Sequence, residues 1–172
     1  MAKWPWIERT FTFQYPIEKH PDIIERFAGL PARAEDRTRG LSRERLVWSD
    51  GGWSILENIG HLLSLEELFD GRIDDYLAGR ERLRAADMTN LATRQAAYNQ
   101  RDIGEVLSSL RAARAAQWRR LIALDASDLA RVAVHPRLGV PMRLIDAVCF
   151  VCEHDDYHMA RVAELRAKQG II

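Results

Sequence analysis

The sequence predicts an all-α protein: an up-down four-helix bundle that follows an extended N-terminal segment. Four segments carry helical apolar spacing over sufficient length, short or irregular connections separate them, and strand patterns are almost absent. At 172 residues the chain has the length of one domain, and we expect residues 1–172 to form a single bundle. One hydrophobic core then serves all four helices.

Residues 1–16 are predicted to form an extended strap. Their aromatic residues are Trp4, Trp6, Phe11, Phe13 and Tyr15. The last three alternate with polar residues, which is the two-residue period of extended backbone. Because no second strand is in sight to pair with this segment, we expect it to lie against the bundle and to cover a groove.

The first helix is predicted to begin at Pro21 and to end before Gly40. Ile23 and Phe27 belong to its apolar face. Gly29-Leu30-Pro31 should kink or interrupt it, because proline lacks the N–H group that the interior of a helix uses.

The second helix is predicted to follow the turn Asp50-Gly51-Gly52. Ser54 and Glu57 form an S-x-x-E capping box, which marks the start of a helix. The helix should run to about Leu77, because Gly79 follows it.

The rest of the chain predicts two more helices. Residues 84–100 are of mixed character, and we expect an irregular connection with some helix. Asp102 can cap a third helix that ends near Leu124. The proline and glycine of residues 135–139 indicate a loop, and the fourth helix is predicted for residues 142–168.

The composition excludes several classes of protein. Hydrophobic residues make up 47% and charged residues 29% of the chain, which is typical of a globular protein. Lys plus Arg and Asp plus Glu both total 25, so no surplus of positive charge exists to bind nucleic acid. No apolar run has the roughly 20 residues that span a bilayer, and residues 1–15 lack the pattern of a signal peptide. We expect a cytoplasmic protein that binds neither nucleic acid nor a membrane.

The two cysteines, Cys149 and Cys152, are three residues apart in the fourth predicted helix. Such a pair is poorly placed to join distant segments, so we expect reduced thiols. Both lie roughly 120° to 180° from His158 around the helix, and we expect them to pack as small hydrophobic residues.

Two histidines of the fourth helix face the interior. His154 and His158 lie within roughly 40° of the apolar stripe of this helix, at about 100° per residue. An i, i+4 pair sets two imidazoles side by side, a spacing that can bind one metal ion. By itself the pair says little, because a buried histidine is more often a hydrogen-bonded core residue.

The second helix carries a polar stripe that bears on this question. Ser54, Asn58 and His61 share one face, which continues as Leu65 and Leu68. Core-facing polar residues cost about 1–3 kcal/mol each when unpaired, so the cluster indicates a site that water, metal or ligand satisfies. His61 is then the natural third ligand, and three histidines leave an open coordination position. A polar mouth of the bundle with hydrogen-bonded histidines and no metal explains the pattern equally well.

At this point the chain resembles the DinB/YfiT-like family of metal-binding helical bundles. The resemblance lies in residues 53–62 (WSILENIGHL), Asn90, Asn99, residues 135–138 (HPRL) and residues 154–158 (HDDYH). Each piece is short, but their order and spacing together are specific and cover nearly the whole chain.

The resemblance implies an up-down four-helix bundle whose metal ligands match His61, His154 and His158. It further implies metal-dependent hydrolases, or S-transferases that move a low-molecular-weight thiol such as bacillithiol or mycothiol onto electrophiles, and many homodimers. Nickel, zinc and iron all fit, and imidazole ligands do not separate them.

The leading hypothesis is therefore an enzyme that acts on a small molecule through one divalent transition metal. As a Lewis acid, the metal would lower the pKa of a water or a thiol. The competing hypothesis is a non-catalytic metal-binding or dimerisation module of a stress response.

Several further residues are candidates with an alternative role. Glu57, one turn before His61, would orient that ligand or accept a proton, although its capping role already explains it. Asp155 and Asp156 would support the ligand histidines, but their rotation off the inward stripe favours solvated side chains.

The loop and the tryptophans also carry alternatives. His135 and Arg137 would bind substrate at the mouth of the pocket, Arg137 through a carboxylate; otherwise His135 bonds to backbone and Arg137 lies on the surface. Trp48 and Trp53 line a substrate pocket or close the end of the bundle, and core packing is the more frequent use of such residues.

Overall fold

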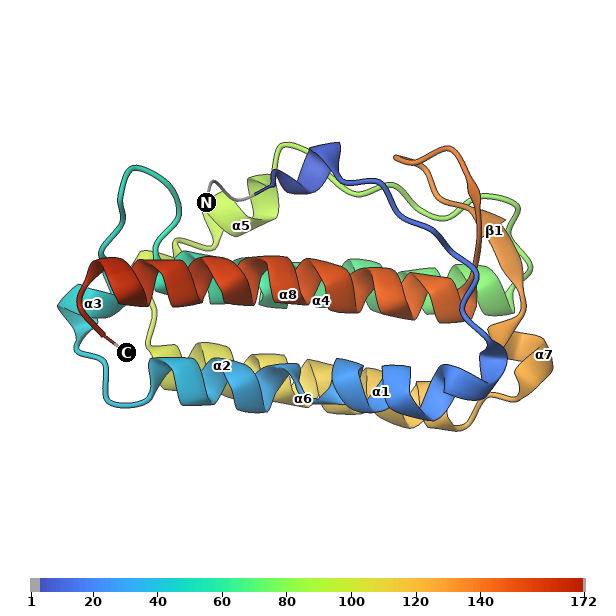
Figure 1. Cartoon of the computed structure of the whole chain (residues 1–172), viewed down its shortest axis with the longest axis horizontal. Helices are drawn as coiled ribbons and strands as arrows, with labels where there is room; N and C mark the ends of the chain where they lie inside the picture. Colours follow the sequence, from blue (N-terminus) through green and yellow to red (C-terminus); the bar gives the residue numbers. More distant parts are fainter. Residues whose placement is uncertain (1–3, 172) are drawn as a thin grey trace.

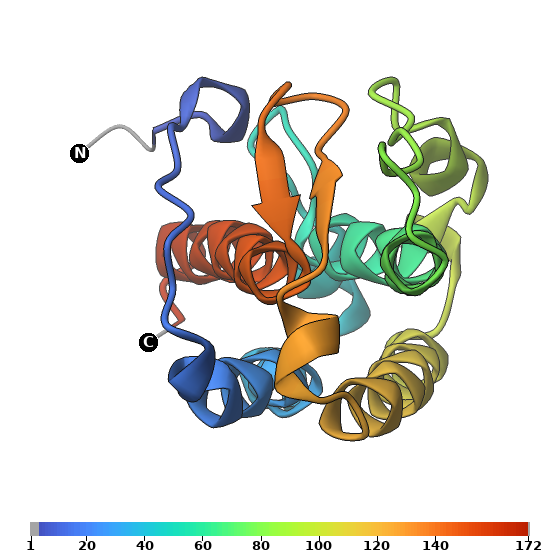
Figure 2. The ribbon, with the colours of Figure 1, turned by 90° about the vertical axis from the view of Figure 1, so that its right-hand side faces the viewer.

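The fold is a four-helix bundle, seen in a computed structural model that describes residues 4–171 (Figure 1). Its long helices are α1 (His20–Ala28) continued by α2 (Leu30–Thr38), α4 (Ile55–Leu77), α6 (Ile103–Ile122) and α8 (Leu144–Lys168). Viewed end-on, they form a square in which α8 and α4 lie above α1 and α6 (Figure 2). The predicted all-α bundle is confirmed.

The up-down order expected from the sequence is not observed, because the helix directions do not alternate along the chain. Residues 78–102 run back along the bundle before α6 begins, so α4 and α6 are parallel (Figure 1). Arg114 of α6 accordingly contacts Glu66 of α4, and Arg120 contacts Asp70 further along both helices. The long connection contains α5 (Leu91–Gln95) and η3 (Tyr98–Gln100), and it lies over one face of α4.

The predicted helix boundaries are confirmed where a cap or a proline marks them. Ser54 Oγ accepts a hydrogen bond from the Glu57 backbone N–H (3.1 Å), and the Glu57 carboxylate accepts one from the Ser54 N–H (2.8 Å). Asp102 caps α6 through the Glu105 N–H. Pro31 lies in the first turn of α2, where its missing N–H has no partner to lose, so the interruption leaves two helices nearly in line.

The sequence missed short elements at both ends of the bundle. β1 (Val132–Val134) and β2 (Pro141–Arg143) form an antiparallel hairpin, so Met142 lies in a strand and α8 begins at Leu144. The remaining short elements are η1 (Trp6–Glu8), η2 (Ile17–Lys19), α3 (Arg43–Val47) and α7 (Ala126–Leu129). Strands of three residues are too short to show an alternating pattern.

The N-terminal segment crosses α8 without forming a strand (Figures 1 and 2). Its aromatic rings pack against α8: the ring centroids of Trp6 and Phe11 each lie 5.0 Å from that of Phe150. Arg143 Nη2 donates to the Tyr15 carbonyl (2.7 Å). Side chains rather than a backbone ladder therefore attach this segment to the bundle.

The core consists of two apolar clusters with polar residues between them. On α8, one cluster ends at Cys152 and the other begins at Met159; on α4 they are divided between Leu62 and Phe69. The residues between the clusters include buried Glu66, Asp155 and other polar groups. The bundle thus has a polar layer across its middle.

Cys149 and Cys152 are buried and form no disulfide, as predicted. Burial raises the pKa of both thiols, which keeps them protonated. None of the helices within residues 4–171 has the length and apolar character needed to cross a membrane.

Gly60 holds the long connection against α4. A Cβ atom on Gly60 would lie 2.1 Å from Cγ of Tyr98, whose ring is almost fully buried and whose hydroxyl bonds to Ser64 Oγ (2.9 Å). Only glycine leaves room for the Tyr98 ring at this point of the helix.

We expect Gly60→Ala to lower the free energy of unfolding by about 1–3 kcal/mol, although alanine favours a helix by about 1 kcal/mol. Gly29→Ala, between α1 and α2, is the control, because its φ is −74° and the nearest atom to its Cβ would be the Glu25 carbonyl oxygen, at an ordinary contact distance of 3.4 Å. Chemical denaturation measures the free energy of unfolding of both variants. Equal stability of the two would contradict the close packing of Tyr98 on Gly60.

Candidate metal centre

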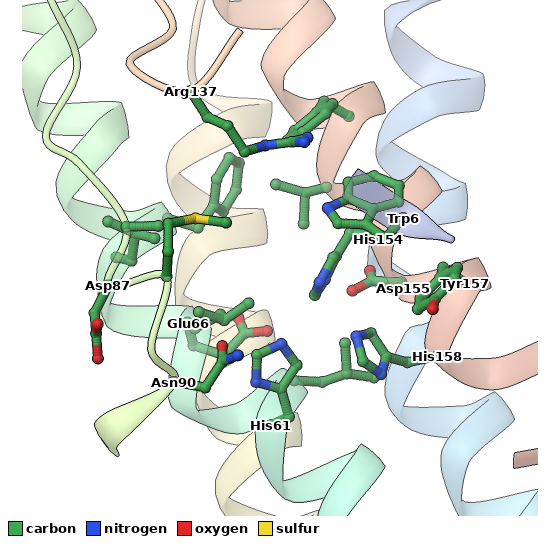
Figure 3. Close-up of a pocket in the computed structure, with 18 of the residues that line it drawn as sticks. Trp6, His61, Glu66, Asp87, Asn90, Arg137, His154, Asp155, Tyr157 and His158 are labelled. Atoms are coloured by element: carbon green, nitrogen blue, oxygen red, sulfur yellow. The ribbon is translucent and has the colours of Figure 1, made fainter. Parts of the chain in front are cut away.

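Three imidazoles from two helices meet at the polar layer (Figure 3). The ring centroid of His61 on α4 lies 5.3 Å from that of His154 and 4.7 Å from that of His158, both on α8. His154 and His158 are one turn apart, with centroids at 4.6 Å. One nitrogen from each ring lies within 4.8 Å of the other two.

The partners of two of these rings select the nitrogen that can bind a metal. The Asn58 amide nitrogen donates to the Ser54 carbonyl (2.7 Å) and the Trp53 carbonyl (3.2 Å), so its oxygen faces His158 Nδ1 (2.9 Å). That oxygen accepts the Nδ1–H hydrogen bond, and the lone pair of His158 is on Nε2. Thr93 Oγ1 lies 3.0 Å from His61 Nδ1 and can act in the same way.

The environment keeps His61 neutral. Its side chain is only 4% exposed, and burial lowers its pKa to about 4. The Trp53 ring packs over it at 4.7 Å and reaches His158 at 6.0 Å. At neutral pH the imidazole therefore has the uncharged form that metals bind.

The donor set fits a first-row transition metal. Metal–imidazole distances are about 2.0–2.1 Å, so two nitrogens on a tetrahedral ion lie about 3.4 Å apart. The three nitrogens lie within 4.8 Å of one another, so binding would draw the rings together by up to about 1.4 Å. Imidazole nitrogen suits zinc, nickel, iron and copper alike.

A buried ionic cluster lies beside the histidines. Arg114, Glu66 and Asp155 are 3%, 5% and 1% exposed. Arg114 Nη1 donates to Asp155 (2.7 Å), and Arg114 Nε donates to both oxygens of Glu66 (3.1 Å each). Burial raises the pKa of both carboxyls, and the guanidinium opposes that shift. With all three groups charged, the cluster has one net negative charge.

The prediction that Asp155 is solvated is therefore wrong. The rotation from His154 to Asp155 turns the carboxylate away from the pocket stripe, but it turns it towards α6, where Arg114 reaches it. Asp156 does lie near the surface, where it binds Arg26 and Arg33 (2.5 Å to Arg33 Nη1).

A cavity of about 600 Å³ opens beside the three histidines. His135, Arg137 and Trp53 line it, as does Trp6, whose ring lies edge-on to His154 with centroids 5.0 Å apart. Trp48 does not line it and is partly exposed.

Glu57 is absent from the pocket wall. Its carboxylate is used in the capping box at the start of α4, and it is not among the residues that line the cavity. The structure does not bring this candidate to the histidines.

Sequence reasoning missed several residues of the site. Thr93 reaches it from a connection whose local pattern gives no sign of it. Trp6 and Arg72 did have a signal: Trp6 belongs to the segment expected to cover a groove, and Arg72 continues the face of α4 that carries His61, Leu65 and Leu68. Arg114 did have a signal: it is spaced four residues after Leu110 on the buried face of α6, where a charged residue requires a partner.

For a metal held by the three histidines, Thr93→Val should weaken zinc affinity about 10–100-fold, because the His61 Nδ1–H loses its acceptor. Thr89→Val is the control, since the Thr89 hydroxyl bonds only to Asp87 in an exposed turn. Competition with a chromophoric chelator measures both affinities. An unchanged affinity in the Thr93 variant would show that its hydroxyl does not orient a ligand.

Comparison with known proteins bears on the fold and the family. YfiT from Bacillus subtilis, described as "a probable metal-dependent hydrolase with an unusual four-helix bundle topology", is a similar solved structure, with a TM-score of 0.83 and 20% identity. The match covers 96% of this chain and 95% of that one, and at this identity it shows a shared fold. No curated protein matches the chain. The model of the DinB superfamily matches residues 26–162, which include all three histidines, and the chain belongs to this superfamily.

Proposed function

We propose that the protein is a metal-dependent enzyme, of the hydrolase or thiol S-transferase type, that acts on a small molecule. His61, His154 and His158 would hold one divalent transition metal: nickel, zinc or iron. The observation that carries the proposal is the convergence of three imidazoles from two helices on the wall of a 600 Å³ cavity. Three protein ligands leave a coordination position open, which is typical of catalytic rather than structural sites.

A bound divalent ion supplies Lewis acidity, which lowers the pKa of a water or thiol nucleophile. The residues of this chain prepare the site for it. Asn58 orients the imidazole of His158, and Thr93 orients that of His61. The Trp53 ring packs against both imidazoles. The two carboxyls that Arg114 binds lie close by, and in their ionised form they favour a cation.

A thiol nucleophile would have to come from outside the chain. Cys149 and Cys152 are absent from the cavity wall, and Cys152 Sγ faces the Ile23 carbonyl (3.9 Å) on α1. Water would make the protein a hydrolase, and an external low-molecular-weight thiol would make it a transferase. The description of YfiT supports the hydrolase form.

A non-catalytic metal-binding or dimerisation module is the second candidate. The observation in its favour is the group of large apolar side chains exposed on the N-terminal segment and the long connection. They are Trp4, Ile7, Met88 and Leu91. We propose that this surface contributes to a homodimer, which the family resemblance also implies.

Metal content tests the site directly. Protein purified without chelator should contain about one equivalent of a transition metal per chain, and alanine at His61, His154 or His158 should abolish it. His20→Ala is the control, because His20 lies at the start of α1 and does not line the cavity. In the wild type, metal at 100 times its Kd should stabilise the fold by about 2.7 kcal/mol. If adding zinc or nickel to the metal-free protein left its melting temperature unchanged, tight binding would be ruled out.

Turnover separates the two candidates. We expect the metal-loaded protein to act on at least one substrate in a panel of amides, esters and thiol–electrophile pairs, and His61→Ala to remove that turnover. The His20→Ala variant should keep it. If the protein is a non-catalytic module, any conversion of these substrates should proceed at the same rate with the wild type and with His61→Ala.

A further inference from the structure

A second group of charged residues lines the same cavity away from the histidines. Arg72 of α4 and Arg137 of the β1–β2 loop both line it, together with His135. Arg72 is only 8% exposed. Its Nε donates to the Arg84 carbonyl (3.1 Å), and its Nη1 lies 3.4 Å from His135 Nε2.

The Arg137 guanidinium points into the cavity with a hydrogen-bonding group unused (Figure 3). Its Nη2 is buried and has no hydrogen-bond partner among the described residues. The carbon of the guanidinium lies 5.7 Å from the ring centroids of Trp6 and Phe150. These aromatic faces hold the cation in place, but they leave its N–H groups without an acceptor.

Neither guanidinium forms an ion pair with any carboxylate in residues 4–171. The acidic residues nearby have other partners. Asp75, one turn beyond Arg72, pairs with Arg84 (3.0 Å), and Asp87 accepts hydrogen bonds from the segment that follows it. Glu66 and Asp155 share Arg114. Arg72 and Arg137 therefore present to one cavity two positive charges that no carboxylate of residues 4–171 pairs with directly.

His135 adds to the surplus of donors. Burial lowers its pKa to about 4, and the Arg72 and Arg137 charges act in the same direction, so the ring is neutral and accepts at one nitrogen only. Yet both ring nitrogens face donors: the Leu138 N–H at 3.3 Å from Nδ1, and Arg72 at Nε2. An acceptor is missing from this corner of the cavity.

We propose that Arg72 and Arg137 form a subsite for a carboxylate, so that the substrate of the proposed enzyme is a small organic acid. Guanidinium groups bind carboxylates with paired, charge-assisted hydrogen bonds, which supply the missing acceptors. Burying a guanidinium without a partner is costly, and a bound anion removes that cost.

The cavity also indicates the chemical character of the middle of the substrate. Arg72 is 11 residues after His61 on α4, so their Cα atoms lie about 16 Å apart along the helix. Leu65, Leu68 and Val151 line the wall together with other apolar residues. The substrate has a carboxylate at one end, an apolar middle, and the group that reacts at the histidines. The assignment of that reacting end rests on the proposed function; the carboxylate subsite does not.

Binding of 4-phenylbutyrate and its neutral isostere 4-phenylbutyramide tests the subsite. Calorimetric titrations use the full-length protein, both metal-free and zinc-loaded. We expect the acid to bind at least about tenfold more tightly than the amide in both forms. Arg137→Gln and Arg72→Gln should each remove most of that preference without weakening amide binding. Arg131→Gln replaces an exposed arginine that pairs with Asp128, and it should not change the preference for the acid.

Because Arg72 is buried, its variant can fail to fold, which circular dichroism detects; the Arg137 variants then decide. Arg137→Lys keeps the charge and should retain part of the preference that Arg137→Gln loses. The subsite would be overturned by equal affinity for the acid and the amide, or by undetectable binding of the acid. It would also be overturned by a preference for the acid that appears only in the zinc-loaded protein and does not change in the Arg137 variants. Acid preference in the metal-free protein without any His61-dependent turnover would refute the proposed function alone. His61-dependent turnover without acid preference would refute the subsite alone.

Discussion

The interaction on which the bundle most depends is the contact of Arg114 on α6 with three other long helices, including α8 at the opposite corner of the square. From α6 its guanidinium binds Glu66 on α4, Asp155 on α8 and the Phe27 carbonyl on α1 (3.3 Å). Removing one partner of a buried ion pair costs about 3–5 kcal/mol, because a charge is left buried and uncompensated. The helices therefore have one relative position in which every group of this cluster is satisfied.

That constraint also explains where the candidate site lies. The ionic cluster divides the apolar core, and the histidines stand at the same level of α4 and α8 as Glu66 and Asp155. A cation bound by the histidines would favour the ionised form of both carboxyls in the cluster. The same cavity then extends towards Arg72 and Arg137, which are positive. Its two ends thus differ in chemistry: imidazoles and carboxyls lie at one, and guanidinium groups at the other.

The sequence predicted those parts of the fold that depend on neighbouring residues. The capping box at Ser54, the break at Pro31 and the inward histidines of α8 are all local patterns, and the structure shows each of them. What it did not predict depends on contacts between distant segments. Thr93 reaches His61 only because the long connection runs back over α4, and Asp155 is buried only because Arg114 stands opposite. No spacing along the chain encodes either contact.

The position of Trp6 has a practical consequence. One wall of the cavity comes from a segment ahead of the first long helix, and aromatic stacking rather than a backbone ladder attaches it. An affinity tag fused ahead of this segment would begin close to that wall of the cavity. The carboxyl end of α8 lies at the α3 end of the molecule, remote from the hairpin loop (Figure 1). A tag that follows α8 starts away from the cavity wall formed by Trp6, which makes that position the better choice for ligand screening.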